Sequence, residues 1–207
     1  MELREAIRGR RSINFFDPQR SIPPEVLREL LELANLAPSS FNLQPWKVVV
    51  VQSPERKQAL RRCAMDQPKA QEASAVLIIT AAPEAVEEHM ERVLQSWLQL
   101  GYIREEAREV YRKMAAELYG QPRSERRRLW AAKNAALFAM LLMLAAQALG
   151  LQTHPMDGFD EACLKREFHI PQEHVVPMLV AVGYPRPGLK LLPRAYRRPL
   201  EEFVRYE

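Results

Sequence analysis

The spacing of hydrophobic residues predicts a chain that alternates between amphipathic helices and short apolar strands. Apolar side chains three or four positions apart indicate helices, and continuous apolar runs indicate strands. The predicted helices cover residues 2–9, 24–37, 54–64, 69–73, 129–149 and 161–168, with two more inside 84–119 that break near Gly101. Strands are predicted over residues 48–51, 75–80 and 177–183, and we expect the first two to be buried. Residues 150–160 are predicted to be a loop.

The helix predicted over residues 129–149 is apolar on nearly every side. Such a helix should be buried all round, which makes it either a central core helix or part of a subunit interface. Residues 84–119 are instead rich in Glu, Arg, Gln and Met. They could pack over the sheet or over the mouth of a site, or serve only as helical filler.

The composition is that of a soluble protein with a single domain. The chain has 207 residues, of which 47% are hydrophobic and 27% charged, and this is enough to build one core. Its charged start has no signal-peptide pattern, and no uncharged apolar run reaches membrane-spanning length. We therefore expect a cytoplasmic protein that has no membrane partner.

Neither the two cysteines nor His154 indicates a metal site. Cys63 and Cys163 lie far apart without metal-ligand spacing, so we expect small buried hydrophobic side chains and no disulfide. His154 has no second histidine or carboxylate at ligand spacing, and we expect a loop or core histidine.

The charge balance is mildly basic, with a net charge of +4 and a pI of about 9.2. The densest basic cluster, residues 123–128, contains a glutamate and leads into an apolar helix, so it is interpreted as a solvated helix start. Without any nucleic-acid-binding module, this balance does not favour a nucleic-acid partner. It suits a protein that holds a phosphate and receives anionic substrates.

Two loops carry the polar groups of a candidate site. Residues 37–51 join a helix to a strand and hold two prolines with Ser39, Ser40, Asn42 and Gln44. They form either a binding loop or an ordinary turn. Residues 10–18 begin with Arg10, Arg11 and Ser12, whose guanidinium and hydroxyl groups form either a phosphate site or a solvated basic turn.

Several well-known site patterns are missing from the sequence. It contains neither the glycine-rich fingerprint of a Rossmann dinucleotide site nor a P-loop, and it lacks the G-x-S-x-G elbow of hydrolases. Any redox chemistry must therefore come from a cofactor that is held in another way.

Four short motifs occur in an order and spacing that resemble the FMN-dependent nitroreductase family. They are Arg10-Arg11-Ser12, then Pro38-Ser39-Ser40-Phe41-Asn42-Leu43-Gln44-Pro45-Trp46, then Pro155-Met156-Asp157-Gly158-Phe159, and last Arg197-Arg198-Pro199-Leu200. The second motif is the most specific. The resemblance runs from end to end except for residues 84–128.

The resemblance implies an α+β fold with a mixed, mainly antiparallel sheet flanked by helices. It also implies one domain over residues 1–207, with 84–128 as a family-variable helical segment. In this family two copies form a homodimer with FMN at the subunit interface. The long central helix would then lie at that interface, and the C-terminal tail would extend over the partner.

The family's site residues carry over by position. Arg10, Ser12 and the tail residue Arg197 match the FMN phosphate site, with Arg11 beside them. Ala195 stands where relatives often have a lysine, a loss for which Arg194 could compensate. The loop that reaches the flavin, partly from the other subunit, is matched by Pro38, Ser39, Ser40, Asn42 and Gln44. Lys69 resembles a lysine near the flavin, and the loop over the isoalloxazine is matched by Pro155, Met156, Asp157 and Gly158.

The resemblance implies that the flavin, rather than a side chain, carries the chemistry, so we name no catalytic residue. Many relatives have a basic residue at position 14, beside the flavin pyrimidine, whereas this chain has Asn14. An amide donates a hydrogen bond without bringing charge. Our hypothesis is that Asn14 gives a lower reduction potential than a lysine would.

The implied function is an oxidoreductase that transfers a hydride from NAD(P)H through flavin N5 to a nitroaromatic, quinone or similar acceptor, with ping-pong kinetics. The alternatives are a specialised flavin enzyme of the same fold, such as a dehalogenase, an enoate-type reductase or a flavin-fragmenting enzyme, or a non-catalytic FMN carrier or redox sensor. Neither the acceptor nor the choice between NADH and NADPH follows from the sequence.

Overall fold

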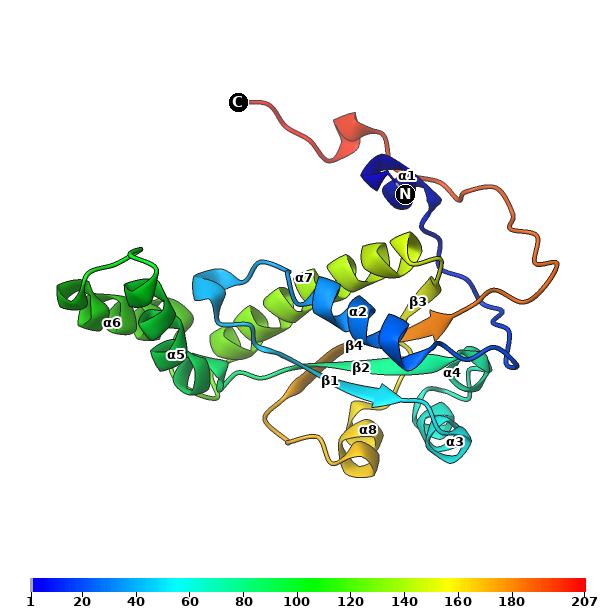
Figure 1. Ribbon diagram of the computed structural model, residues 1–207, viewed down its shortest axis with the longest axis horizontal. Helices are drawn as coiled ribbons and strands as arrows, with labels where there is room; N and C mark the ends of the chain where they lie inside the picture. The colour runs from blue at the N-terminus through cyan, green and yellow to red at the C-terminus, as the bar shows by residue number, and fades with distance from the viewer. Residues whose placement is uncertain (1) are drawn as a thin grey trace.

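The computed structural model describes residues 2–207 and places helices on both faces of one sheet (Figure 1). The helices are α1 (Leu3–Gly9), α2 (Pro24–Ala34), α3 (Pro54–Cys63), α4 (Lys69–Glu72), α5 (Ala85–Gln99), α6 (Arg108–Tyr119), α7 (Glu125–Ala148) and α8 (Glu161–Phe168). The strands are β1 (Trp46–Val51), β2 (Ala75–Ala81), β3 (Gln152–Met156) and β4 (Val175–Gly183). The predicted helices are thus confirmed to within a few residues.

The sheet has the order β1-β2-β4-β3, and each neighbouring pair of strands is antiparallel. Within residues 2–207, parallel pairing is confined to an isolated bridge between Ser12 and Thr153. The predicted α+β fold is confirmed, and its sheet is more fully antiparallel than the mixed sheet we expected.

Local sequence signals account for where several helices begin. Ser124 accepts a hydrogen bond from the Arg127 amide at the start of α7, and Ser53 and Asp160 cap α3 and α8 in the same way. Proline stands at the first position of α2 and α3, where its missing N–H is not needed. The break predicted near Gly101 lies just after α5, and Gly101 has a φ of 75°.

Two strand predictions require correction. β2 is buried along its whole length as predicted, but Val48, Val49 and Val50 of β1 are only half-buried, because β1 is an edge strand. The segment predicted to be a loop contains β3, the opposite edge strand. Pro155 lies inside β3, and an edge strand tolerates proline because one side of it has no partner strand.

The alternating side chains of the sheet enter two hydrophobic clusters. The larger cluster packs α2, α5 and α7 against one face, and its members include Leu77 of β2 and Val180 of β4. The smaller cluster packs α3, α4 and α8 against the other face and includes Ile78 of β2. Ile13 and Phe16 also join the smaller cluster, so the segment that follows α1 is anchored to this face.

α7 is long and apolar enough to cross a membrane by length and composition, and no other helix in residues 2–207 meets that description. It packs against α2, β2 and β4, as expected of a core helix. Leu129, Leu137 and Met140 remain exposed by 42–70%, so in the single chain α7 is not buried all round.

The basic start of α7 is also less solvated than predicted. Arg127 is 1% exposed, and its guanidinium donates to the Glu87 carboxylate at 2.8 Å and to the Gly120 carbonyl at 2.6 Å. The neighbouring arginines, Arg126 and Arg128, are exposed as expected. Helical periodicity turns one arginine of the run inward, where an acidic partner on α5 offsets the cost of burial.

The prediction that the cysteines do not pair is wrong. Cys63, at the end of α3, and Cys163, in α8, form a disulfide across a sequence separation of 100 residues. Sequence spacing could not indicate this pairing, because α3 and α8 meet only through the tertiary fold. Cys63 is buried as expected, whereas Cys163 is partly exposed.

Candidate flavin site

A cluster of arginines forms where the C-terminal tail returns to the start of the chain, and we call Arg10, Arg11, Arg194 and Arg197 the arginine cluster. The Arg11 guanidinium donates to the Leu192 carbonyl at 3.1 Å, and Arg194 donates to the backbone carbonyls of residues 8 and 10. Figure 1 shows the tail passing α1. The two ends of the chain therefore supply one concentration of positive charge.

The cluster has the electrostatics of an anion site. Burial, followed by the charges of Arg194, Arg197 and Arg11, lowers the pKa of Arg10 below its ordinary value. Like charges held this close repel one another, and a bound anion would relieve that repulsion. Arg10 also lies 3.5 Å from the Ser12 hydroxyl, a further donor for an anion.

A second polar group joins Asn14, Lys69 and His154. The Lys69 ammonium donates to the Asn14 amide oxygen at 3.2 Å, and burial lowers the pKa of Lys69. The His154 Nδ1 atom donates to the Ile13 carbonyl at 2.8 Å. Burial lowers the pKa of His154, the bond to Ile13 opposes this, and the Lys69 charge adds to it. Lys69 of α4 therefore places a positive charge beside Asn14.

The turn after α3 holds in place the segment of Pro155, Met156, Asp157 and Gly158. The Gln67 amide donates to the Gly158 carbonyl at 2.8 Å. A Cβ at Gly158 would lie 3.0 Å from the same Gln67 nitrogen and 3.3 Å from the Met65 sulfur, so these two side chains pack closely against the Gly158 backbone. Met65 and Gln67 were not identified from the sequence, because no local pattern links them to residue 158.

The loop Ser39–Gln44 has an unusual backbone. Phe41, Asn42 and Gln44 have φ values of 56°, 52° and 44°, in the left-handed region that residues with a Cβ rarely adopt. The Ser39 hydroxyl accepts a hydrogen bond from the Gln44 amide at 2.9 Å. Pro38 precedes this loop and Pro45 ends it, as expected from the sequence.

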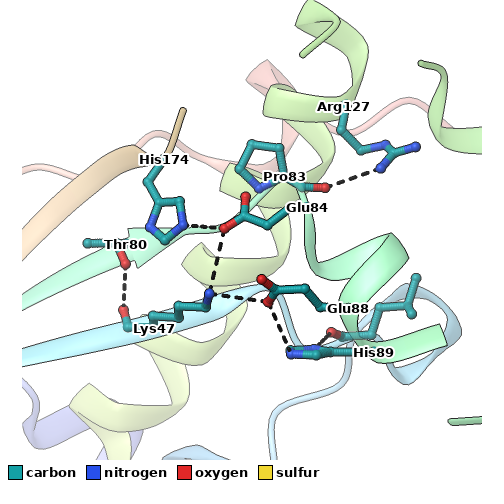
Figure 2. Close-up of polar contacts among 9 residues, drawn as sticks. Lys47, Thr80, Pro83, Glu84, Glu88, His89, Arg127 and His174 are labelled. Carbon is teal, nitrogen blue, oxygen red and sulfur yellow. Dashed lines mark hydrogen bonds and ion pairs between the residues drawn. The ribbon is translucent and has the colours of Figure 1, made fainter. Parts of the chain in front are cut away.

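Side chains from distant elements hold the loop in this conformation. The Ser40 amide donates to the Asn134 side chain at 2.9 Å, and the Ser40 hydroxyl lies 2.5 Å from the Tyr119 hydroxyl. The His89 Nδ1 atom donates to the Leu43 carbonyl at 2.7 Å (Figure 2). No local sequence pattern predicts these three partners, since each lies at least 46 residues away from its contact.

Figure 2 shows the polar network that fixes the start of α5, the helix that carries His89. Lys47 pairs with the Glu88 carboxylate at 3.2 Å and with Glu84 at 3.6 Å, and Glu84 also contacts the buried His174. Burial would raise the pKa of Glu84, but hydrogen bonds from its own backbone and from His174 outweigh burial and lower the pKa. The network therefore keeps Glu84 charged and sets the position of α5.

One chain does not bring all the predicted site residues together. Gly9, beside the arginine cluster, lies near Gln147 of α7, whereas Ser40 contacts Asn134 on the same helix. Thirteen helical residues rise roughly 20 Å, which separates the two groups along α7. Within residues 2–207, no group of three His, Cys, Asp or Glu residues could hold a metal ion.

Comparison with known proteins gives a consistent result. The sequence profile of the nitroreductase family matches residues 7–184. The chain is 35% identical over 207 residues to a protein of Thermus thermophilus named NADH dehydrogenase, covering 99% of this chain and 95% of the relative. It is 33% identical over 205 residues to MhqN of Bacillus subtilis, a protein named for NAD(P)H nitroreductase activity, covering 99% and 98%.

Solved structures agree with this result. A protein of Exiguobacterium sibiricum, named as a nitroreductase and solved in complex with FMN, superposes with a TM-score of 0.88 at 26% identity. The superposition covers 100% of this chain and 98% of that one. The motifs, the fold and the sequence relatives agree, and the chain belongs to the nitroreductase family.

Proposed function

We propose that this protein is an FMN-dependent oxidoreductase that uses NAD(P)H to reduce a nitroaromatic, a quinone or a similar acceptor. The observation that carries the proposal is the arginine cluster, in which Arg10 lies beside the Ser12 hydroxyl and among the charges of Arg11, Arg194 and Arg197. A terminal phosphate suits such a cluster, because guanidinium groups bind phosphate oxygens with two donors each. The relative solved with FMN supports the choice of cofactor.

The residues present fit FMN. Arg10, Arg11, Ser12 and Arg197 would hold the phosphate, and Arg194 supplies the cation that Ala195 cannot. Lys69 and Asn14 would face the polar edge of the ring, where a cation stabilises the negative charge of the reduced form. When bound, FMN accepts a hydride from NAD(P)H and passes it to the acceptor in a second step, which gives ping-pong kinetics.

The remaining residues position the cofactor and shape its surroundings. In the segment Pro155, Met156, Asp157 and Gly158, the three residues after the proline have backbone N–H groups, which can donate hydrogen bonds without changing protonation state. Pro38, Ser39, Ser40, Asn42 and Gln44 form the second wall. Because this wall lies roughly 20 Å along α7 from the arginine cluster, we propose that a site is completed by two copies of the chain.

The exposed side chains of α7 support a homodimer. Leu129, Leu137 and Met140 are large apolar side chains exposed on one side of α7, and such a stripe suits a second copy. In this proposal the exposed tail extends over the partner. Replacing Leu137 with Asp should weaken both dimer formation and FMN binding, as measured by light scattering and flavin fluorescence. A monomer that retains FMN would contradict the shared site.

The proposal is tested first by the visible spectrum of the purified protein. We expect flavin absorption, with FMN released on denaturation, and bleaching when NADH or NADPH is added without oxygen. Initial rates at several acceptor concentrations should give the parallel double-reciprocal lines of a ping-pong mechanism. A protein that stays colourless after FMN is supplied would overturn the proposal, and flavin that neither nucleotide reduces would favour a non-catalytic carrier.

A cytoplasmic location is also part of the proposal. The observation against it is the disulfide between Cys63 and Cys163, since disulfides are uncommon in cytoplasmic proteins outside hyperthermophiles. Fractionating cells that make the tagged protein, followed by thiol labelling of the cytoplasmic fraction, would test location and pairing together.

A further inference from the structure

The inference concerns the loop Ser39–Gln44 and the helices that hold it. Left-handed backbone at a residue with a Cβ is strained and persists where the surroundings enforce it. Phe41, Asn42 and Gln44 all adopt it within four positions. The loop therefore depends on its neighbours for its shape, and its neighbours are residues that the family motifs do not include.

Tyr119 is the neighbour that reaches the loop from α6. Its hydroxyl lies 2.5 Å from the Ser40 hydroxyl, and the side chain is 4% exposed. Burial raises the pKa of Tyr119, so the phenol keeps its proton at neutral pH and remains available as a donor. A partly buried hydroxyl pair of this kind restrains the rotamers of both side chains.

The same serine is fixed from a second side by α7. Asn134 accepts from the Ser40 amide at 2.9 Å, and its own amide nitrogen donates to the Trp130 carbonyl at 2.8 Å. Asn134 is 1% exposed and cannot change its orientation without losing one of these bonds. With the backbone of Ser40 held in this way, Tyr119 decides where the hydroxyl of Ser40 points.

Aromatic packing adds to the hydrogen bonds. The Phe41 ring lies 5.9 Å from the Tyr119 ring, nearly perpendicular to it, and 5.9 Å from the Trp97 ring on α5. Offset and edge-to-face pairs at this distance are favourable beyond the area they bury. One side chain, Tyr119, therefore contacts two consecutive residues of the loop, one through its hydroxyl and one through its ring.

We propose that Tyr119 is a positioning residue of the flavin site, which acts through Ser40 to hold the loop Ser39–Gln44 in the shape the site requires. The inference rests on the proposed function, in which this loop forms one wall of the FMN site. This proposal gives the helical segment 84–128 a definite role, because α5 and α6 hold the loop in position and are more than helical filler.

The test is a double-mutant cycle on the full-length protein. Tyr119→Phe removes the hydroxyl and keeps the ring, Ser40→Ala removes its partner, and the double variant removes both. We expect Tyr119→Phe to weaken FMN binding about three- to tenfold, which corresponds to the loss of one hydrogen bond. The double variant should bind no more weakly than Ser40→Ala, since the two side chains act as one unit.

Tyr111→Phe is the matched control. Tyr111 lies on the same helix, and its ring is 6.1 Å from that of Phe41, but its hydroxyl has no part in the proposal. FMN affinity and the visible spectrum of bound flavin should be unchanged in this variant. A spectral shift in Tyr119→Phe that is absent from Tyr111→Phe separates positioning from a general loss of stability.

Hydrogen exchange of the FMN-free protein provides a readout that does not need the cofactor. The Ser40 and Gln44 amides should exchange faster in Tyr119→Phe than in wild type or Tyr111→Phe. Equal exchange and equal FMN affinity in Tyr119→Phe and wild type would overturn this inference alone, as would additive effects of Tyr119→Phe and Ser40→Ala. A wild-type protein that binds no FMN would overturn the proposed function, and with it a flavin role for Tyr119.

Discussion

One face of the sheet is covered by α7, a helix of 24 residues, together with α2, whereas the other is covered by the short helices α3, α4 and α8. The first face carries the loop Ser39–Gln44, whose Leu43 belongs to the larger hydrophobic cluster. The second carries the segment after α1 and the end of β3, through Ile13 and Met156. Each face thus supports a different wall of the proposed flavin site.

The two faces reach a fixed geometry by different means. On the α7 side, a large apolar core and buried hydrogen bonds are enough to hold a strained loop. On the opposite side the helices have 10, 4 and 8 residues, and a covalent bond between α3 and α8 supplements the core. Small hydrophobic clusters stabilise weakly, so a crosslink matters most where the packed surface is smallest.

The largest expected effect follows from removing the disulfide. Replacing both Cys63 and Cys163 with Ala should lower the free energy of unfolding by about 3–5 kcal/mol, because the bond closes a long loop in the unfolded chain. Urea unfolding without reductant measures this. Wild-type protein with dithiothreitol should match the variant. Equal stability of all samples would show that the face covered by α3, α4 and α8 does not depend on the disulfide for its stability.

The second effect concerns the arginine cluster, which lies beside the C-terminal end of α7. Arg10→Ala should weaken FMN binding by about 10- to 150-fold, because a charge-assisted hydrogen bond contributes about 1.5–3 kcal/mol. Calorimetry at two salt concentrations should also show a smaller salt dependence in the variant. Arg4→Ala is the control, since Arg4 is exposed on α1 outside the cluster. If Arg10→Ala and Arg4→Ala bind FMN with equal affinity, the arginine cluster does not hold the FMN phosphate.

A smaller effect is expected at the polar edge of the site. Asn14→Lys should raise the flavin midpoint potential by roughly 20–40 mV, or about 1–2 kcal/mol, because an added cation stabilises the reduced, more negative flavin. Anaerobic titration against a reference dye measures the potential, with Asn14→Gln as the uncharged control. An unchanged or lower potential in Asn14→Lys would contradict this hypothesis. It would indicate that Lys69, 3.2 Å from Asn14, already provides the positive charge beside the flavin.

The smallest effect is a pH dependence that arises from His154. Its pKa is lowered in the folded protein, chiefly by burial, so the folded chain binds a proton less readily than the unfolded chain. Stability should therefore be fully present above the ordinary value of 6.5 and decline as the pH falls from there toward the lowered value. Urea midpoints measured between pH 7.5 and pH 5.5 should decline less steeply in His154→Asn than in wild type.

The sequence by itself determined most of the local structure. Helix caps, prolines and apolar periodicity act over a few residues, and they placed the helices to within a few positions. The motifs that begin at Arg10 and Pro38 lie mostly in segments that connect helices and strands, whereas the motif that begins at Pro155 starts inside β3. The part these residues have in binding FMN stays a prediction until it is measured.

Only the tertiary structure decided which distant side chains meet. It paired Cys63 with Cys163, turned Arg127 inward toward Glu87, and placed β3 at a sheet edge where Pro155 is tolerated. It also brought Tyr119 to Ser40, 79 positions away. Such contacts depend on how whole helices and strands pack. The local sequence around one residue therefore does not identify its distant partner.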